Sequence, residues 1–85
     1  MMVTAEQIRA ARALLGWSQG DLVERSGLSL TTVRRMEDEG IGPGRSSAEN
    51  VATVQRIIEA AGVQFIPENG GGAGVRLARP KGSGS

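Results

Sequence analysis

The chain contains no cysteine and no histidine, and its aromatic residues amount to one tryptophan and one phenylalanine. Without cysteine no disulfide can cross-link the fold, and the thiolate ligands of a zinc site are missing. Without histidine the commonest general base and metal ligand are missing too, which removes most enzyme classes. Catalysis by carboxylates alone stays open, but no pair of acidic residues lies in an apolar setting that would shift one of them. We therefore expect a protein that is not an enzyme and that needs no cofactor and no metal.

An excess of charge is also lacking, since 10 Lys and Arg residues face 9 Asp and Glu residues, a net charge of +1. Binding to an anionic partner must then come from a local cluster of charge. The sequence has no run of 18 apolar residues, and the segment MMVTAEQIRAAR lacks a hydrophobic signal core. We expect a cytoplasmic, nucleoid-associated protein without membrane contact. Its 85 residues predict one domain with a small core.

Hydroxyl side chains in capping positions predict the starts of four helices. These caps are Thr4, Ser18, Ser29 and the Ser46-Ser47 pair. The expected helices end at Gly16, at Gly27, between Asp38 and Gly40, and at Gly62. After Gly62 the apolar pattern becomes strand-like over residues 63–66 and 74–79, and a glycine-rich loop between them lets the chain reverse. An isolated hairpin is marginally stable, so this one should lie on the helices or pair with a second chain.

Two short helices joined by Ser26-Gly27-Leu28 have the anatomy of a helix-turn-helix. An apolar set is expected to lock these helices together: Leu22, Val23, Leu28, Val33 and Met36. The outer face of the third helix then stays free, with arginine and threonine side chains that suit base edges and a leucine that suits a thymine methyl group. The helix start suits phosphate oxygen. The candidate DNA-binding residues are Gln19, Ser29, Leu30, Thr31, Thr32, Arg34, Arg35 and Arg45.

The order and spacing of four segments resemble the Cro/C1-type (Xre-like) helix-turn-helix repressors. The segments are Ile8-Arg9-Ala10-Ala11-Arg12, Gly16-Trp17-Ser18-Gln19, Gly27-Leu28-Ser29 and Val33-Arg34-Arg35-Met36-Glu37. The resemblance implies a lambda-repressor-like bundle in which Arg12 of the first helix pairs with Glu37 of the third. It also implies base contacts by Leu30, Thr31 and Arg35 and phosphate contacts by Gln19 and Thr32. Strands replace the fifth helix of the phage repressors, so their mode of dimerisation does not carry over.

The resulting prediction is a mainly α bundle of four helices with a C-terminal two-stranded β-hairpin. Residues 1–62 form the DNA-binding domain, residues 63–80 a dimerisation or partner-binding segment, and residues 81–85 a flexible tail. The expected function is sequence-specific binding of double-stranded DNA by a small transcriptional regulator, with the recognition helix 29–38 in the major groove. A homodimer on an inverted repeat is expected, because one such helix reads only a few base pairs. The candidate interface residues are Phe65, Ile66, Val75 and Leu77.

Two other functions stay open. In one, the chain is a DNA-binding antitoxin whose C-terminal strands bind a protein partner by strand addition. In the other, it is a protein adaptor that no longer binds DNA, as the near-zero net charge and the acidic run Glu37-Asp38-Glu39 would favour. Arg76 and Arg79 are expected either as solvated strand residues or as a second contact to phosphate.

Overall fold

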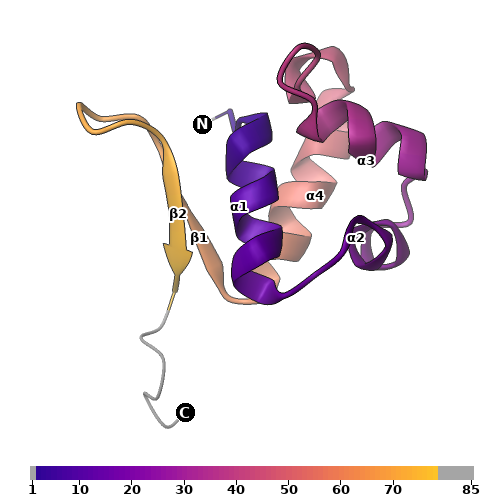
Figure 1. Cartoon of the computed structure of the whole chain (residues 1–85), viewed down its shortest axis with the longest axis horizontal. Helices are drawn as coiled ribbons and strands as arrows, with labels where there is room; N and C mark the ends of the chain where they lie inside the picture. Colours follow the sequence, from indigo (N-terminus) through magenta and orange to yellow (C-terminus); the bar gives the residue numbers. More distant parts are fainter. Residues whose placement is uncertain (1, 79–85) are drawn as a thin grey trace, which may run out of the picture.

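The chain folds into four α-helices followed by a two-stranded antiparallel sheet, as predicted, in the computed structural model that describes residues 2–78 (Figure 1). The elements in order are α1 (Ala5–Leu15), α2 (Gln19–Ser26), α3 (Leu30–Glu37), the short 3-10 helix η1 (Pro43–Arg45), α4 (Ala48–Ala60), β1 (Val63–Ile66) and β2 (Gly74–Leu77). The described part of the chain contains no helix that is long and apolar enough to cross a membrane.

The predicted helix starts are confirmed, because each α-helix begins directly after a hydroxyl side chain that accepts a backbone N–H three residues on. These N-caps are Thr4, Ser18, Ser29 and Ser47. The first two form complete capping boxes, in which Gln7 and Asp21 return a hydrogen bond to the cap backbone.

Glycine closes the first two helices as predicted, with φ of 69° at Gly16 and 74° at Gly27. The third helix ends within one residue of the expected Asp38, but the expected closure by Gly40 is wrong. It stops at Glu37, and Asp38 has an extended backbone with φ of −83° and ψ of 126°. The Asp38 carboxylate accepts the N–H of Gly40 at 2.7 Å, so a side chain rather than a left-handed glycine turns the chain here.

One apolar core includes side chains from the helices and from β1. Its fully buried members include Ile8, Leu22, Val33, Met36 and Ile58. Val63 and Phe65 of β1 belong to the same cluster and are 1% and 5% exposed. The hairpin therefore completes the core of the helices, and the expected boundary between residues 62 and 63 runs through one continuous core.

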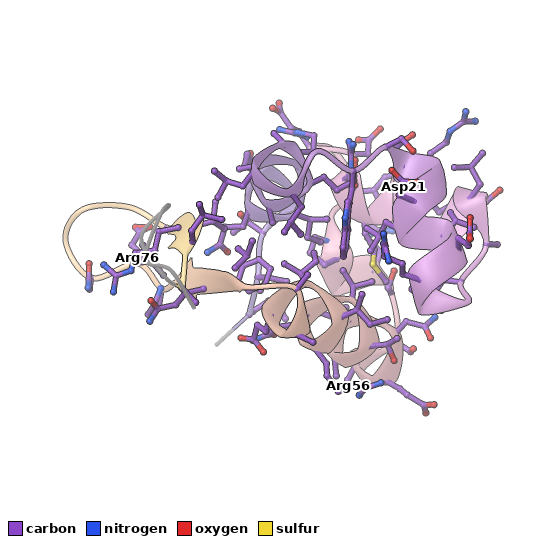
Figure 2. All side chains as sticks on the ribbon, turned by 90° about the horizontal axis from the view of Figure 1, so that it is seen from below. Asp21, Arg56 and Arg76 are labelled. Carbon is purple, nitrogen blue, oxygen red and sulfur yellow. The ribbon has the colours of Figure 1, made fainter. Side chains whose placement is uncertain are left out.

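The hairpin presents an apolar face to the helices and a polar face outward. Val63 pairs with Leu77 and Phe65 with Val75, and these four side chains lie in the core or pack against it. Gln64 pairs with Arg76 on the other face, where the Arg76 Nε donates to the Gln64 Oε1 at 2.8 Å. Figure 2 shows Arg76 on the side away from the helices. The strand expected to reach Arg79 ends at Leu77, and Arg79 lies outside the described residues, as do residues 80–85.

A buried glutamine fastens the hairpin to α1. The Gln7 Nε2 donates to the carbonyl oxygens of Ile66 at 3.0 Å and Gly74 at 2.9 Å, the last paired residues before the loop. Its Oε1 accepts the backbone N–H of Thr4 at 2.9 Å. All the hydrogen-bonding groups of this amide are used, as its 2% exposure requires. Gln7 thus joins the first helix cap to the end of the sheet.

Candidate nucleic-acid interface

Helices α2 and α3 are joined by Gly27, Leu28 and Ser29, a turn short enough to fix their relative orientation. Gly27 adopts the left-handed backbone that glycine accepts without strain. The predicted packing between the helices is confirmed: Leu22, Val33 and Met36 are fully buried, and Val23 and Leu28 are half-buried against them. This packing places Val33 and Met36 on the inner side of α3 and leaves the opposite side uncovered.

The uncovered side of α3 carries most of the predicted contact residues. Leu30, Thr31, Arg34 and Arg35 are exposed, and Leu30 keeps 40% of its surface in solvent although it is apolar. Thr32 is half-buried, and its Oγ1 accepts a hydrogen bond of 2.9 Å from the Ser29 hydroxyl. The Ser29 oxygen also accepts the N–H of Thr32. Ser29 thus caps α3, as predicted, and the Thr32 hydroxyl proton stays available to an acceptor.

A hollow of about 470 Å³ separates α3 from the connector that follows it. Its lining consists of Thr32, Arg35, Ile41, Arg45, Ser46 and Asn50. Arg45, predicted from the sequence to contact DNA from the connector, lines this hollow together with Arg35 of α3. The lining has two guanidinium groups, two hydroxyl groups and an amide, and no carboxylate, so it suits an anionic group.

The basic side chains of this surface are not neutralised by the neighbouring acidic run. Within residues 2–78, no ion pair involves Arg34, Arg35 or Arg45. Glu39, by contrast, pairs with Arg9 of α1 at 3.0 Å. Arg9 also donates to the backbone carbonyl of Glu37. No role for Arg9 was predicted, although its position three residues before Arg12 on one side of α1 was a usable signal.

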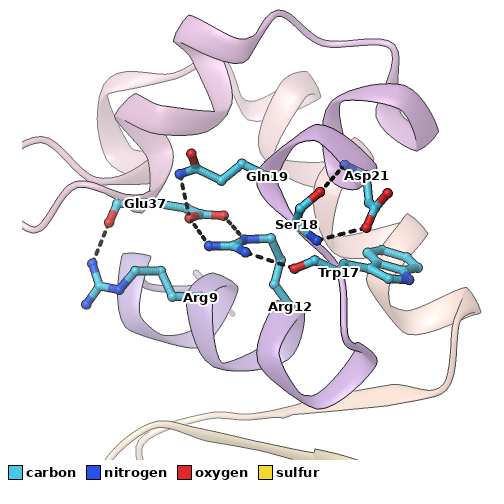
Figure 3. A network of polar contacts seen from close by, with 7 residues as sticks. All are labelled: Arg9, Arg12, Trp17, Ser18, Gln19, Asp21 and Glu37. Atoms are coloured by element: carbon cyan, nitrogen blue, oxygen red, sulfur yellow. Dashed lines mark hydrogen bonds and ion pairs between the residues drawn. The ribbon is translucent and has the colours of Figure 1, made fainter.

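The predicted ion pair between Arg12 and Glu37 is present and forms the centre of a buried network (Figure 3). The Arg12 Nε and Nη2 donate to the two carboxylate oxygens at 2.7 and 2.8 Å. Its Nη1 donates to the Trp17 carbonyl at 2.9 Å. The hydrogen bond to Glu37 raises the pKa of Arg12 above its ordinary value, against the opposing effect of burial. The pair ties α1 to the end of α3 and removes the Glu37 charge from the surface.

Gln19 joins this network at the start of α2. Its Nε2 donates to the Glu37 Oε1 at 3.0 Å, as Figure 3 shows. Sequence reasoning assigned Gln19 to a phosphate contact and missed this bond to α3. One amide proton and the amide oxygen of Gln19 remain available. The side chain is therefore held in a defined orientation between the two helices.

The four predicted dimer or partner residues differ in how far they are buried. Phe65 is buried in the core of its own chain, and Val75 and Leu77 pack against that core from the same face of the sheet. Phe65 is thereby closed to a partner, whereas Val75 and Leu77 remain partly exposed. Ile66 lies on the opposite face and is half-buried. What the hairpin can still offer a partner is its edge.

Comparison with known proteins does not assign the chain to a family. No protein-family model matches the chain, and no curated protein matches it either.

Proposed function

We propose that the chain binds double-stranded DNA through α3, as a sequence-specific transcriptional regulator with a lambda-repressor-like helix-turn-helix of the Cro/C1 type. The observation that carries this proposal is the uncovered side of α3. It presents arginine, threonine and leucine side chains together, while two of the three acidic residues at the end of the helix, Glu37 and Glu39, are bound by α1. Exposed groups of these kinds on one helix suit the major groove.

Base contacts are assigned to the exposed residues of the helix. Arg35 is placed to bond the O6 and N7 of guanine, and Thr31 to bond a base edge or touch a thymine methyl group. Leu30 is apolar and 40% exposed, which suits contact with such a methyl group. Arg34 lies on the same exposed surface and adds positive charge to it.

Phosphate contacts are assigned to groups around the hollow and at the start of α2. Arg45 and Thr32 both line the hollow beside Arg35, so they can hold the backbone of a strand while Arg35 reads the groove. Gln19, oriented by Glu37 at 3.0 Å, supplies its remaining amide proton from the other side. Contacts of this type fix the register of a protein on the duplex without reading sequence.

The adaptor hypothesis stays open, but one of its two supports is weaker, because two residues of the acidic run Glu37-Asp38-Glu39 are paired with arginines of α1. Glu37 is 4% exposed and bonded to Arg12, and Glu39 is bonded to Arg9. The antitoxin hypothesis also has the chain bind DNA through α3. It differs from the proposed homodimer in that another protein binds the hairpin.

The test is selection of bound sequences from a random duplex pool, followed by titration of the selected duplex against salt. We expect an enriched inverted repeat and an affinity that falls steeply with salt, by a log–log slope of about 0.9 for each phosphate neutralised. A variant with Arg35→Ala should enrich a repeat in which one base position of each half-site is relaxed, and Arg56→Ala, which removes an exposed arginine of α4, should enrich the unchanged repeat. Absence of enrichment together with a flat salt response would refute the proposal.

A further inference from the structure

The two edges of the hairpin differ in how far they are covered. Val63 and Phe65 of β1 are 1% and 5% exposed as whole residues, backbone included, so the edge of β1 is closed by the fold. Their partners Leu77 and Val75 of β2 remain partly exposed. The edge of β2 is therefore the less covered of the two, and we call it the open edge.

The phase of the hydrogen-bond ladder shows which backbone groups this edge offers. The N–H of Ala78 donates to the Gly62 carbonyl at 2.7 Å, so residues 62 and 78 are a hydrogen-bonded pair. Such pairs alternate along an antiparallel ladder with pairs whose N–H and C=O groups point away from each other. The pairs of Val63 with Leu77 and Phe65 with Val75 are of the second kind. Val75 and Leu77 thus direct their N–H and C=O groups toward the open edge.

None of the usual protections covers the edge of β2. The strand Gly74–Leu77 contains no proline, and its pairing with β1 is continuous without a bulge. Its one charged side chain, Arg76, is drawn toward β1 by the bond to Gln64. Apolar surface lies nearby: Leu14 is 45% exposed and sits two helical turns after Gln7, on the side of α1 that meets the hairpin.

We propose that the edge of β2 pairs with the same edge of a second copy of this chain, in an antiparallel four-stranded sheet centred on Val75. The choice of a second copy rests on the proposed function, since one α3 helix covers too few base pairs to define an operator. An isologous pairing satisfies each exposed N–H with a C=O of the partner. Figure 1 shows α3 at the opposite end of the molecule from the hairpin, so the pairing leaves α3 uncovered.

Charge decides the register of the pairing. Only residues with outward N–H and C=O groups can be hydrogen-bonded across the axis, so the axis can pass through Val75, Arg76 or Leu77. An axis at Leu77, the last residue of β2, would leave only the Leu77 pair within the strand. Centring on Val75 or on Arg76 remains. Centring on Arg76 would place two arginines directly opposite each other, a destabilising arrangement. Centring on Val75 places Arg76 opposite Gly74 of the other copy. Gly74 has open space where a side chain would begin, which leaves room for the arginine.

Disulfide trapping tests this register directly, because the chain contains no cysteine. Residues 74 and 76 of opposite copies would form a non-hydrogen-bonded pair with Cα atoms about 4.5 Å apart, within the range of a disulfide. Under oxidation without DNA, an equimolar mixture of Gly74→Cys and Arg76→Cys should give a cross-linked dimer. Each variant alone should give only background. Cross-linking of Arg76→Cys alone, or none in the mixture, would overturn the proposed pairing.

Sedimentation of the intact chain without DNA provides the second measurement. The wild type and Val75→Ala should sediment as dimers, whereas Val75→Pro, which removes an outward N–H without breaking the ladder to β1, should be monomeric with an unchanged circular dichroism spectrum. A dimer that survives the proline would place the interface elsewhere. A monomeric wild type that still selects a duplex would overturn the strand pairing but not the proposed DNA binding. A cross-linked dimer that selects no duplex would overturn the proposed DNA binding but not the strand pairing.

Discussion

Glu37 of α3 receives the guanidinium of Arg12 of α1 through two hydrogen bonds of 2.7 and 2.8 Å. A carboxylate on the proposed recognition helix is thereby turned inward, and only 3% of its side chain is exposed. Repulsion between this acid and the phosphates of DNA is removed by the same contact that holds α3 in place. The stability of the fold and the proposed binding of DNA therefore both depend on this ion pair.

Replacing Arg12 with methionine should lower the free energy of unfolding by about 3 kcal/mol, because the buried Glu37 carboxylate loses its charged partner. Urea unfolding followed by circular dichroism measures the change, with Arg56→Met as a control of about 0.5 kcal/mol or less. Equal losses in the two variants would contradict the prediction.

The raised pKa of Arg12 means that its contribution to the free energy of unfolding is fully present below the ordinary arginine pKa. This contribution is lost only as the pH rises through the higher value. The loss should thus be constant across neutral pH.

Gln7→Glu should destabilise the chain by about 3 kcal/mol, because a buried carboxylate would then face the carbonyl oxygens of Ile66 and Gly74 that now accept its Nε2 protons. Gln64→Glu is the matched control, since it makes the same change where the side chain faces the Arg76 Nε at 2.8 Å. The control should be neutral or slightly stabilising in urea unfolding. A Gln7 variant as stable as the Gln64 variant would show that the two hydrogen bonds from Gln7 to the hairpin, which we call the Gln7 clamp, contribute little to stability.

Arg35→Ala should weaken binding to the selected duplex by about 1–3 kcal/mol and relax the preference at one base position in each half-site. Titration against duplexes that vary each position in turn measures both effects. Arg56→Ala, which removes an exposed arginine of α4, controls for the loss of one positive charge. An Arg35 variant that binds its operator unchanged would remove this residue from the contact surface.

Arg45→Ala should weaken binding to all duplexes about equally and reduce the salt slope by about 1, because a phosphate contact carries no sequence information. Arg45 and Arg35 line the same hollow, yet their substitutions are expected to have different effects. Loss of Arg35 should change the base preference, and loss of Arg45 should change the salt slope. A change in base preference without a change in slope would assign Arg45 to a base instead.

Local features of the fold were predictable from the sequence because their causes are local. A hydroxyl at Thr4, Ser18 and Ser29 followed by a helix-forming segment predicts each start, and a glycine at positions 16 and 27 predicts two of the ends. The closure of α3 was mispredicted because Gly40 suggested a glycine cap, whereas the Asp38 side chain turns the backbone two residues earlier. Competition between two residues able to end a helix is not resolved by local pattern.

Contacts between distant segments were predictable only where a resemblance supplied them. The pair of Arg12 and Glu37 came from the resemblance, and the bond of Gln19 to the same carboxylate did not. Phe65 was assigned to an interface because an apolar residue on an edge strand suits a partner and a core equally well. Which of the two it meets depends on how the hairpin lies on α1, and that is decided by residues far along the chain.

The clamp at Gln7 also has a consequence for the order of events during synthesis. Its partners Ile66 and Gly74 lie 59 and 67 residues further along the chain. While the chain emerges from a ribosome, the part of α1 that packs on the hairpin must stay uncovered until β1 and β2 have been made. The core therefore closes late, and folding should be slower than in a helical bundle of the same size, whose contacts are mostly local. A chain halted before residue 74 would present to chaperones and proteases the surface that the finished protein hides.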